Sequence, residues 1–282
     1  MHGGAGPVAG RDYSVVEDHL RELAAEGQSR LESGAAALDV VEYAVAKLEA
    51  SGMYVAGKGS APNTAGYVEL DASIMDGATR EAGAVAAIVG VVNPISVARR
   101  IMQETPHVML AGKGALAFAR SQDMEEVGDA ENYYVLPIGV YEDEIYEQKH
   151  GTVGAVALDL SGGLAAATST GGTFGKLEGR VGDSPLIGPG TWADDDVAIS
   201  FTGTGEHIIR SGGAISIAHK VAAGMSVDQA IQDVLDEIRR LGGDAGVIVI
   251  DRNGEIAMPY NSDGMKRASV SSTSPLMATT FS

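Results

Sequence analysis

Apolar residues in the first fifty positions recur at helical spacing in two stretches. The first starts at Ser14, where Ser14 and Glu17 have the spacing of a capping box, and its apolar positions are Val15, Leu20, Leu23, Ala24 and Leu31. The second covers about residues 35–50, and its stripe consists of Leu38, Val41, Ala44, Val45 and Leu48. The pattern therefore predicts two helices that pack as one layer on a sheet.

Strand-like and helix-like segments follow one another along the rest of the chain. Residues 68–75 alternate between apolar and polar, residues 83–89 resemble a fully buried strand, and Pro94 opens a helix. In the second half, the pattern predicts hairpins at 152–169 and 246–259, a strand at 197–201, and helices at about 206–222 and 226–241. Ser226 and Gln229 form a second capping box. Strands with helices to both sides predict a layered α/β architecture.

One segment interrupts this order. Residues 120–150 carry many acidic side chains and little periodicity, so we expect a solvated, mobile connector there. Its end is abrupt, because residues 148–151 lead directly into the small-residue strand that begins at Thr152.

Composition excludes several classes of function. The chain has 282 residues with 20 Lys plus Arg and 38 Asp plus Glu, a formal net charge of −18 that disfavours nucleic acid as a partner. The longest nearly uncharged apolar stretch, residues 82–92, is too short to cross a membrane. No cysteine is present, which excludes disulfides, thiolate metal sites and a cysteine nucleophile. Without a recognisable secretory signal, the cytoplasm is the expected location.

Common catalytic motifs are missing as well. The six histidines occur singly, without a pair at i, i+4, so no zinc ligand set is visible and we expect no metal. The Gly-Lys pairs at 112–113 and 175–176 lack the spacing of a phosphate-binding loop, and no Gly-x-Ser-x-Gly motif occurs. Nucleotide binding and a serine triad are therefore unsupported.

Small and polar residues gather instead at predicted strand ends in the second half. They are Thr152, residues 168–172, residues 179–185 and residues 202–205. Each group alone has an ordinary structural explanation, because threonine favours strands and an Arg-x-x-Asp pair is usually a surface salt bridge. Together they suit one cleft, in which glycines expose backbone N–H groups, an arginine binds a carboxylate and an aspartate binds an ammonium. This combination fits the zwitterionic head of an amino acid.

The same segments resemble a known family. Residues 150–159, 166–172, 179–185 and 202–206, together with 2–6 and 69–77, closely resemble the plant-type asparaginase/isoaspartyl peptidase family of N-terminal-nucleophile hydrolases. The resemblance covers essentially the whole chain. It implies a four-layer αββα sandwich, made as a precursor that cuts itself between Gly151 and Thr152. The two products, 1–151 with the acidic connector at its end and 152–282, would remain together as one structural domain.

The resemblance also implies roles for individual residues. Thr152 is expected to be the nucleophile, with its freed α-amino group as the base, and Thr170 to hydrogen-bond its hydroxyl. Thr202 and Gly203 correspond to the oxyanion donors. The substrate-binding positions are Arg180, Val181, Gly182, Asp183, Thr202, Gly203, Thr204 and Gly205. Arg180 and Asp183 would hold the α-carboxylate and the α-ammonium of the substrate.

The implied reaction hydrolyses L-asparagine and β-aspartyl dipeptides through an acyl group on Thr152, with no cofactor. Two alternatives remain within the class, a glycosylasparaginase and an endopeptidase of the taspase kind, and outside it a non-processing amino-acid-binding protein. The resemblance implies a dimer of cleaved chains.

The chain also departs from the family pattern at three places. Met1 directly precedes His2 where an apolar strand is usual, so we expect a trimmed start or a lost edge strand. Val55 replaces an asparagine in the loop before Gly57, which in the family often holds a structural sodium ion through backbone carbonyls. Residues 194–196 form an unusually acidic turn, to which we assign no catalytic role.

Overall fold

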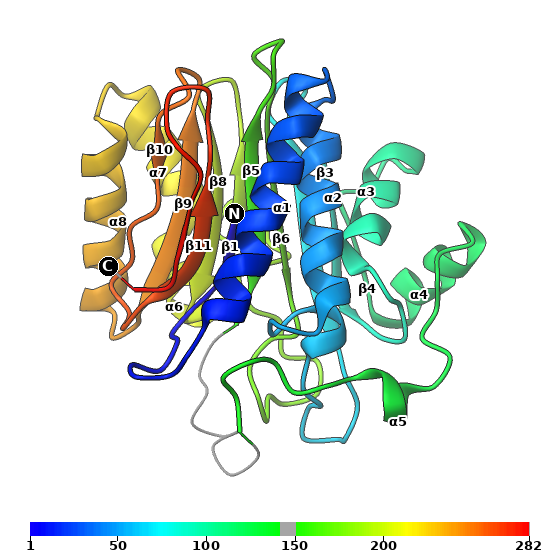
Figure 1. Cartoon of the computed structure of the whole chain (residues 1–282). Helices are drawn as coiled ribbons and strands as arrows, with labels where there is room; N and C mark the ends of the chain where they lie inside the picture. The colour runs from blue at the N-terminus through cyan, green and yellow to red at the C-terminus, as the bar shows by residue number, and fades with distance from the viewer. Residues whose placement is uncertain (142–150, 282) are drawn as a thin grey trace.

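A computed structural model describes residues 1–141 and 151–281 of the chain (Figure 1). Within these residues the strands form two stacked sheets. The larger has eight strands in the order β12-β11-β1-β5-β6-β2-β3-β4, and the smaller has four in the order β10-β9-β8-β7. The strands are β1 (His2–Ala5), β2 (Leu70–Asp76), β3 (Ala82–Ile88), β4 (Met109–Ala111), β5 (Val153–Leu158), β6 (Leu164–Thr170), β7 (Thr191–Ala193), β8 (Val197–Gly203), β9 (Ala245–Asp251), β10 (Ile256–Ala257), β11 (Met265–Ser269) and β12 (Met277–Thr279).

Helices cover the outer faces of both sheets, which confirms the predicted αββα sandwich. The larger sheet carries α1 (Ser14–Glu32), α2 (Ala37–Ser51), α3 (Pro94–Glu104) and α4 (Gly112–Ser121), and the smaller sheet carries α7 (Gly213–Ala222) and α8 (Val227–Arg240) (Figure 1). Shorter helical segments are η1 (Gly57–Gly59), α5 (Ala130–Tyr133) and α6 (Gly205–Ser211). In the described part of the chain, every helix is too short or too polar to span a bilayer.

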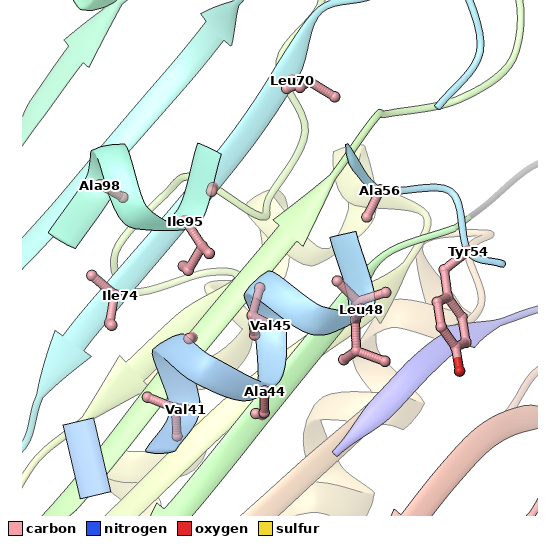
Figure 2. Packing of buried hydrophobic residues seen from close by; sticks show 14 of the residues in the cluster. Val41, Ala44, Val45, Leu48, Tyr54, Ala56, Leu70, Ile74, Ile95 and Ala98 are labelled. Atoms are coloured by element: carbon pink, nitrogen blue, oxygen red, sulfur yellow. The ribbon is translucent and has the colours of Figure 1, made fainter. Parts of the chain in front are cut away.

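Successive side chains of the central strands point to opposite faces of the large sheet, so these strands contribute to two separate hydrophobic cores. Ala165 and Ala167 of β6 face the layer of α1 to α3, whereas Leu164 and Ala166 face the smaller sheet. Figure 2 shows the first core, where the apolar side of α2 packs on the large sheet and next to α3. The residues labelled there are Val41, Ala44, Val45, Leu48, Tyr54, Ala56, Leu70, Ile74, Ile95 and Ala98. Each fully buried leucine or isoleucine contributes roughly 1.5 to 3 kcal/mol relative to exposure.

Helix boundaries confirm one predicted cap and correct another. Ser226 caps α8 as expected, since its hydroxyl accepts a hydrogen bond from the Gln229 backbone N–H at 3.3 Å, but the Gln229 side chain donates to Asp233 at 3.0 Å, so only the Ser226 half of the predicted box is confirmed. α1 begins at Ser14, yet Tyr13 occupies the cap position without a side-chain bond, and the Ser14 N–H donates instead to Asp12 at 2.8 Å. The predicted capping box at Ser14 is therefore wrong.

The predicted helix at 206–222 is two helices. Gly212 adopts a left-handed conformation with φ of 74°, which ends α6, and Gly213 starts α7. A β-carbon on Gly213 would lie 2.1 Å from the carbonyl oxygen of Pro189, so only glycine fits at this close approach. Apolar spacing continues across the break, which is why periodicity alone joined the two helices.

The strand at the start of the chain is an interior strand. His2 of β1 lies opposite Arg267 of β11 on one side and Gly154 of β5 on the other. The expectation of a lost edge strand is therefore wrong for the described sheet, whose edges are the three-residue strands β4 and β12. The motif at 2–6 consists largely of glycine, so it carried no strand signal of its own.

The acidic connector contacts the body of the protein over much of its length. The Val127 N–H donates to the Gly90 carbonyl at 2.8 Å, and the Val135 N–H donates to the Lys58 carbonyl at 3.0 Å. Val140 is buried. Most of residues 120–141 are nevertheless exposed, as expected for a solvated connector, and its mobility stays a prediction. The rest of the predicted connector, residues 142–150, lies outside the described residues.

Candidate active site

The predicted cleavage site lies at the entrance of β5. β5 and β6 pair antiparallel with Val153 opposite Ser169, and this register brings Gly151 and Thr152 next to Thr170 at the end of β6. Thr152 and Thr170 are only 4% and 3% exposed. Because β5 and β6 lie side by side within the large sheet, the backbone around the predicted nucleophile is held by the sheet.

Two hydroxyls converge on one carbonyl. The Thr170 Oγ1 donates to the Gly151 carbonyl oxygen at 2.6 Å, and the Thr152 Oγ1 donates to the same oxygen at 2.8 Å. Thr170 also accepts a hydrogen bond from the Gly172 N–H at 2.9 Å, which fixes the orientation of its hydroxyl. The carbonyl that precedes Thr152 is thus polarised by two donors in a buried environment.

Close packing leaves no room for a side chain at the position before Thr152. A β-carbon on Gly151 would lie 2.2 Å from the Val55 Cβ. On the opposite side, a β-carbon on Gly4, whose φ is 103°, would lie 3.5 Å from the Gly151 Cα. The backbone at Gly151 is therefore confined between the loop before Gly57 and the glycines of β1.

A small pocket opens beside Thr152 and gathers most of the predicted site. It is lined by Gly151, Thr152, Thr170, Gly172, Thr173, Arg180, Gly182, Asp183, Ser184 and Gly203. Gly172, Thr173 and Ser184 had no assigned role, although each lies in or directly after a motif segment. Val181, Thr202, Thr204 and Gly205 do not line this pocket.

Two side chains of opposite charge type, the carboxyl group of Asp183 and the guanidinium of Arg180, line the pocket. Asp183 is 3% exposed, and its Oδ2 has no hydrogen-bond partner among the described residues. Burial raises the pKa of Asp183 to about 7, with Arg180 acting in the opposite direction. A β-carbon on Gly205 would lie 2.9 Å from Asp183 Oδ1 and 3.1 Å from Arg180 Nη2, which explains glycine there. The buried carboxylate is ready to accept a cationic group.

Glu206 orients the arginine. Its Oε1 accepts a hydrogen bond from Arg180 Nε at 2.9 Å and lies 2.8 Å from Nη2 in an ion pair, and the Arg180 side chain is 17% exposed. Glu206 belongs to the motif at 202–206, but the motif alone predicts no role for it. Glu206 directly follows Gly205, a predicted substrate-binding residue at the start of α6, and this position in the sequence could have placed it in the same cleft.

The predicted oxyanion residues lie where β8 ends. Gly203 lines the pocket with a φ of 142°. Thr202 is fully buried, and its Oγ1 accepts a hydrogen bond from the Ala5 N–H at 3.1 Å, which leaves its own proton available to donate. Thr204 turns to Asp244, with its Oγ1 donating to Oδ1 at 2.7 Å.

A buried chain of polar side chains connects the two sides of the site between the sheets. Its members, in order, are His2, Ser200, Thr168, Thr191 and Ser73. At one end His2 Nδ1 bonds the Thr152 carbonyl at 3.2 Å, and at the other Ser73 donates to the Ser184 carbonyl at 2.6 Å. Burial lowers the pKa of His2 to about 3, so this histidine is neutral and structural. The chain fixes Thr152 relative to the segment that carries Asp183.

Metal binding finds little support in the side chains. In residues 1–141 and 151–281, no group of three or more histidines and carboxylates is placed to hold a metal ion. In the loop before Gly57, the Val55 carbonyl accepts from the Gly171 N–H at 2.9 Å and the Met53 carbonyl accepts from the Ile138 N–H at 3.3 Å. These carbonyls therefore hold the loop against the site, and the sodium ion stays a prediction.

A larger cavity exists at the opposite end of β5. Its volume is about 300 Å³, and apolar residues such as Val41, Ala157 and Ile250 from α2, β5 and β9 line it. It contains none of the predicted site residues. We therefore place the candidate active site in the small pocket, where the polar groups converge.

Two stacked sheets between helical layers, with the proposed threonine at the start of a central strand, are the architecture of N-terminal-nucleophile hydrolases. Residues 1–136 and 129–277 match the sequence model of the family described as asparaginase, and the chain belongs to that family.

Curated relatives agree with this assignment. The chain is 44% identical to the isoaspartyl peptidase of Escherichia coli K12, over 95% of this chain and 91% of the relative. It is 40% identical to the human isoaspartyl peptidase/L-asparaginase, over 93% and 89%, and 37% identical to that of Xenopus laevis, over 96% and 91%. The similarity extends across both halves of the chain, so the chain is a hydrolase of this family.

Proposed function

We propose that this chain is a self-processing hydrolase that cleaves L-asparagine and β-aspartyl dipeptides through an acyl group on Thr152. The observation that carries the proposal is the Gly151 carbonyl, which accepts hydrogen bonds from Thr152 and Thr170 beside the Arg180 and Asp183 pair. The names of the relatives, isoaspartyl peptidase and L-asparaginase, support the substrate class.

Maturation is an acyl shift followed by hydrolysis. The Thr152 Oγ1 rotates from the Gly151 oxygen onto its carbon and forms a C–O bond, and the C–N bond between the two residues breaks as the Thr152 nitrogen takes a proton. The Thr170 hydroxyl stabilises the developing oxyanion on Gly151. Water then cleaves the ester, which yields a Gly151 carboxylate and restores the Thr152 hydroxyl. The products are 1–151 and 152–282.

Turnover repeats this chemistry with an external acyl group. The free α-amino group of Thr152, whose ordinary pKa is near 7.7 to 8.0, takes the hydroxyl proton as the oxygen attacks the β-carbonyl of the substrate. The Gly203 N–H and the Thr202 hydroxyl donate to the tetrahedral oxygen. Ammonia or an amino acid leaves with the proton, and water releases aspartate from Thr152. No step requires a metal or an organic cofactor.

Recognition of the substrate rests on its charged head. Arg180 binds the α-carboxylate with the part of its guanidinium that Glu206 does not occupy, and Asp183 binds the α-ammonium. Asp183 lacks a partner among the described residues, so an arriving ammonium supplies the hydrogen bond that its Oδ2 is missing. Gly182 lines the pocket, and Gly205 packs against both of these side chains. Val181 and Thr204, which do not line the pocket, stay predicted binding positions.

The proposal extends to assembly and location. We expect two cleaved chains to form a dimer, which light scattering coupled to size-exclusion chromatography measures. We expect a cytoplasmic location, which cell fractionation tests. Treatment with a chelator should leave turnover unchanged, because the proposed steps use no metal.

A side-by-side assay tests the substrate class. L-asparagine, β-Asp-Leu and a glycosylated asparagine are offered to the cleaved protein, and release of ammonia, leucine or the glycosylamine is measured. The proposal predicts the highest rates on the first two. A dominant rate on the glycosylated substrate would favour a glycosylasparaginase, cleavage of a folded protein substrate would favour a taspase-like endopeptidase, and binding of aspartate without turnover would favour a non-processing binding protein.

A further inference from the structure

A second pocket lies on the other side of Gly151. It is bordered by Gly151 itself, Val55, Val140, Tyr13 and Lys266, among others. In the uncut chain its volume is about 10 Å³, enough for one water molecule and too small for an amino acid. Gly151 also borders the pocket that holds Arg180 and Asp183, so this residue lies between the two spaces.

Cleavage removes that separation. Gly151 is tied to the site by its peptide bond to Thr152, and its backbone fills the space against Val55. Once the bond is cut, Gly151 becomes the end of the first fragment and is free to move away. A β-aspartyl substrate with its charged head at Arg180 and Asp183 then directs its leaving group into the space that Gly151 vacated, toward Val55 and the second pocket.

Lys266 supplies a cation in this pocket. Its ammonium lies 4.9 Å from the centre of the Tyr13 ring, and it forms no ion pair with any described residue. A β-carbon on Gly3 would lie 3.4 Å from the Lys266 Cβ, and one on Gly4 would lie 3.5 Å from the Gly151 Cα. Lys266 and Gly151 therefore both adjoin the glycines of β1, and both border the second pocket. Burial lowers the pKa of Lys266 to about 8, so a carboxylate is the partner that its charged form lacks.

We propose that Lys266 and Val55 form the subsite for the amino acid that leaves from a β-aspartyl dipeptide. Lys266 pairs with the free α-carboxylate of that amino acid, and Val55 contacts its side chain. The class of preferred substrate is then a β-aspartyl dipeptide with a free C-terminus and an apolar second residue. Ammonia from asparagine has neither group and gains nothing from the subsite. The inference rests on the proposed function.

The test compares two substrates that differ only in charge. The cleaved enzyme is given β-Asp-Leu and β-Asp-Leu amide, and kcat/KM is measured for each. A charge-assisted hydrogen bond to Lys266 predicts a preference for the free acid of about tenfold or more. The same ratio is then measured for Lys266→Met, where it should fall close to one, and for Lys266→Arg, where part of it should return. Lys113→Met, a change at an exposed lysine on α4, is the matched control and should retain the wild-type ratio.

A second ratio tests the apolar contact. The wild type should favour β-Asp-Leu over β-Asp-Gly, and Val55→Ala should reduce that preference several-fold. A wild-type enzyme that cleaves acid and amide equally well would overturn the role of Lys266, whatever the variants do. If Lys266→Met fails to mature, the wild-type ratio decides alone. An enzyme that cleaves neither asparagine nor any dipeptide contradicts the proposed function itself, so the two failures are distinguishable.

Discussion

The chain is held very differently on the two sides of the Gly151–Thr152 bond. After the bond, β5 lies inside the large sheet between β6 and β1, and the Thr152 carbonyl is fixed by His2. Before the bond, residues 123–141 form no strand and are mostly exposed, and they contact the body through backbone hydrogen bonds, such as that from the Val135 N–H to Lys58, and through a few side chains such as Val140. The difference shows that Thr152, the proposed nucleophile, adjoins a strand inside the sheet, while the segment before the proposed cleavage site adds no strand to it. The proposed cleavage would therefore free an amino group without removing a strand.

The largest effect is expected from removing the nucleophile. Thr152→Ala should abolish self-cleavage and turnover together, because the same hydroxyl attacks Gly151 and the substrate. Denaturing gel electrophoresis follows cleavage, and ammonia release from asparagine follows turnover. Thr152→Ser keeps a hydroxyl and serves as the control, which should still mature. Efficient ammonia release by uncut Thr152→Ala would contradict the mechanism.

The next effect concerns the hydroxyl of Thr170. Thr170→Val removes the 2.6 Å hydrogen bond to the Gly151 carbonyl at nearly constant volume, and self-cleavage should slow about 10²- to 10³-fold. The rate is measured from the disappearance of the full-length band. Thr170→Ser should remain within about tenfold of the wild type. Equal rates for the valine variant and the wild type would remove Thr170 from the mechanism.

Replacing Asp183 should weaken substrate binding and change the pH dependence of kcat/KM. Asp183→Asn should lower kcat/KM by about 10- to 100-fold, since a neutral amide replaces the charged partner of the substrate ammonium. In the wild type, kcat/KM for asparagine should fall as the pH drops below 7, because protonation removes the charge of Asp183. The pH profile of the cleaved enzyme between pH 5 and 9 measures this. A profile that is unchanged in Asp183→Asn would assign the acidic limb to another group.

The same raised pKa carries a stability prediction of the opposite sign. The folded-state pKa of about 7 lies above the ordinary value of 3.8, so the folded state binds more protons in this window and the free energy of unfolding falls as the pH rises from 4 to 7. Asp183→Asn removes this penalty and should be more stable than the wild type at pH 8, by no more than about 4 kcal/mol. Urea unfolding at pH 4 and pH 8 checks whether the gain appears only at the higher pH.

A pair of substitutions measures the contrast between the rigid part and the connector. Ile74→Ala, in the core of β2, should cost about 2 to 5 kcal/mol of the free energy of unfolding. Val135→Ala, in the connector at 42% exposure, should cost within about 0.5 kcal/mol. Urea unfolding monitored by far-ultraviolet circular dichroism compares them. Similar losses for both would show that the connector is part of the cooperative core.

Regular alternation made much of the fold predictable. The strands at β2, β3, β5 and β6 and the helices α1 to α3 follow apolar patterns that their burial reproduces. The apolar pattern failed to predict elements whose bounds depend on backbone geometry rather than on the burial of side chains. The glycines of β1 carry no apolar signal, and the break between α6 and α7 depends on the left-handed Gly212 inside a continuous apolar stripe.

The sequence predicted those residues of the candidate site whose side chains suit one particular chemical role, such as a threonine nucleophile or an arginine that binds a carboxylate. The structure gathers Thr152, Thr170, Arg180, Asp183 and Gly203 around one pocket, as their motifs implied. The proposed roles of Glu206 and Lys266 depend on contacts between segments far apart in the sequence, namely Arg180 with the start of α6, and β11 with the glycines of β1. Sequence spacing does not encode such contacts, so only the fold revealed them.

Self-cleavage at Gly151 is the central claim, and intact-mass spectrometry of the purified protein over several days tests it without choosing a substrate. We predict two species whose masses sum to the 28.9 kDa chain plus one water, the smaller beginning at Thr152. A single species that remains at the full mass, while the protein still hydrolyses asparagine, would contradict the account.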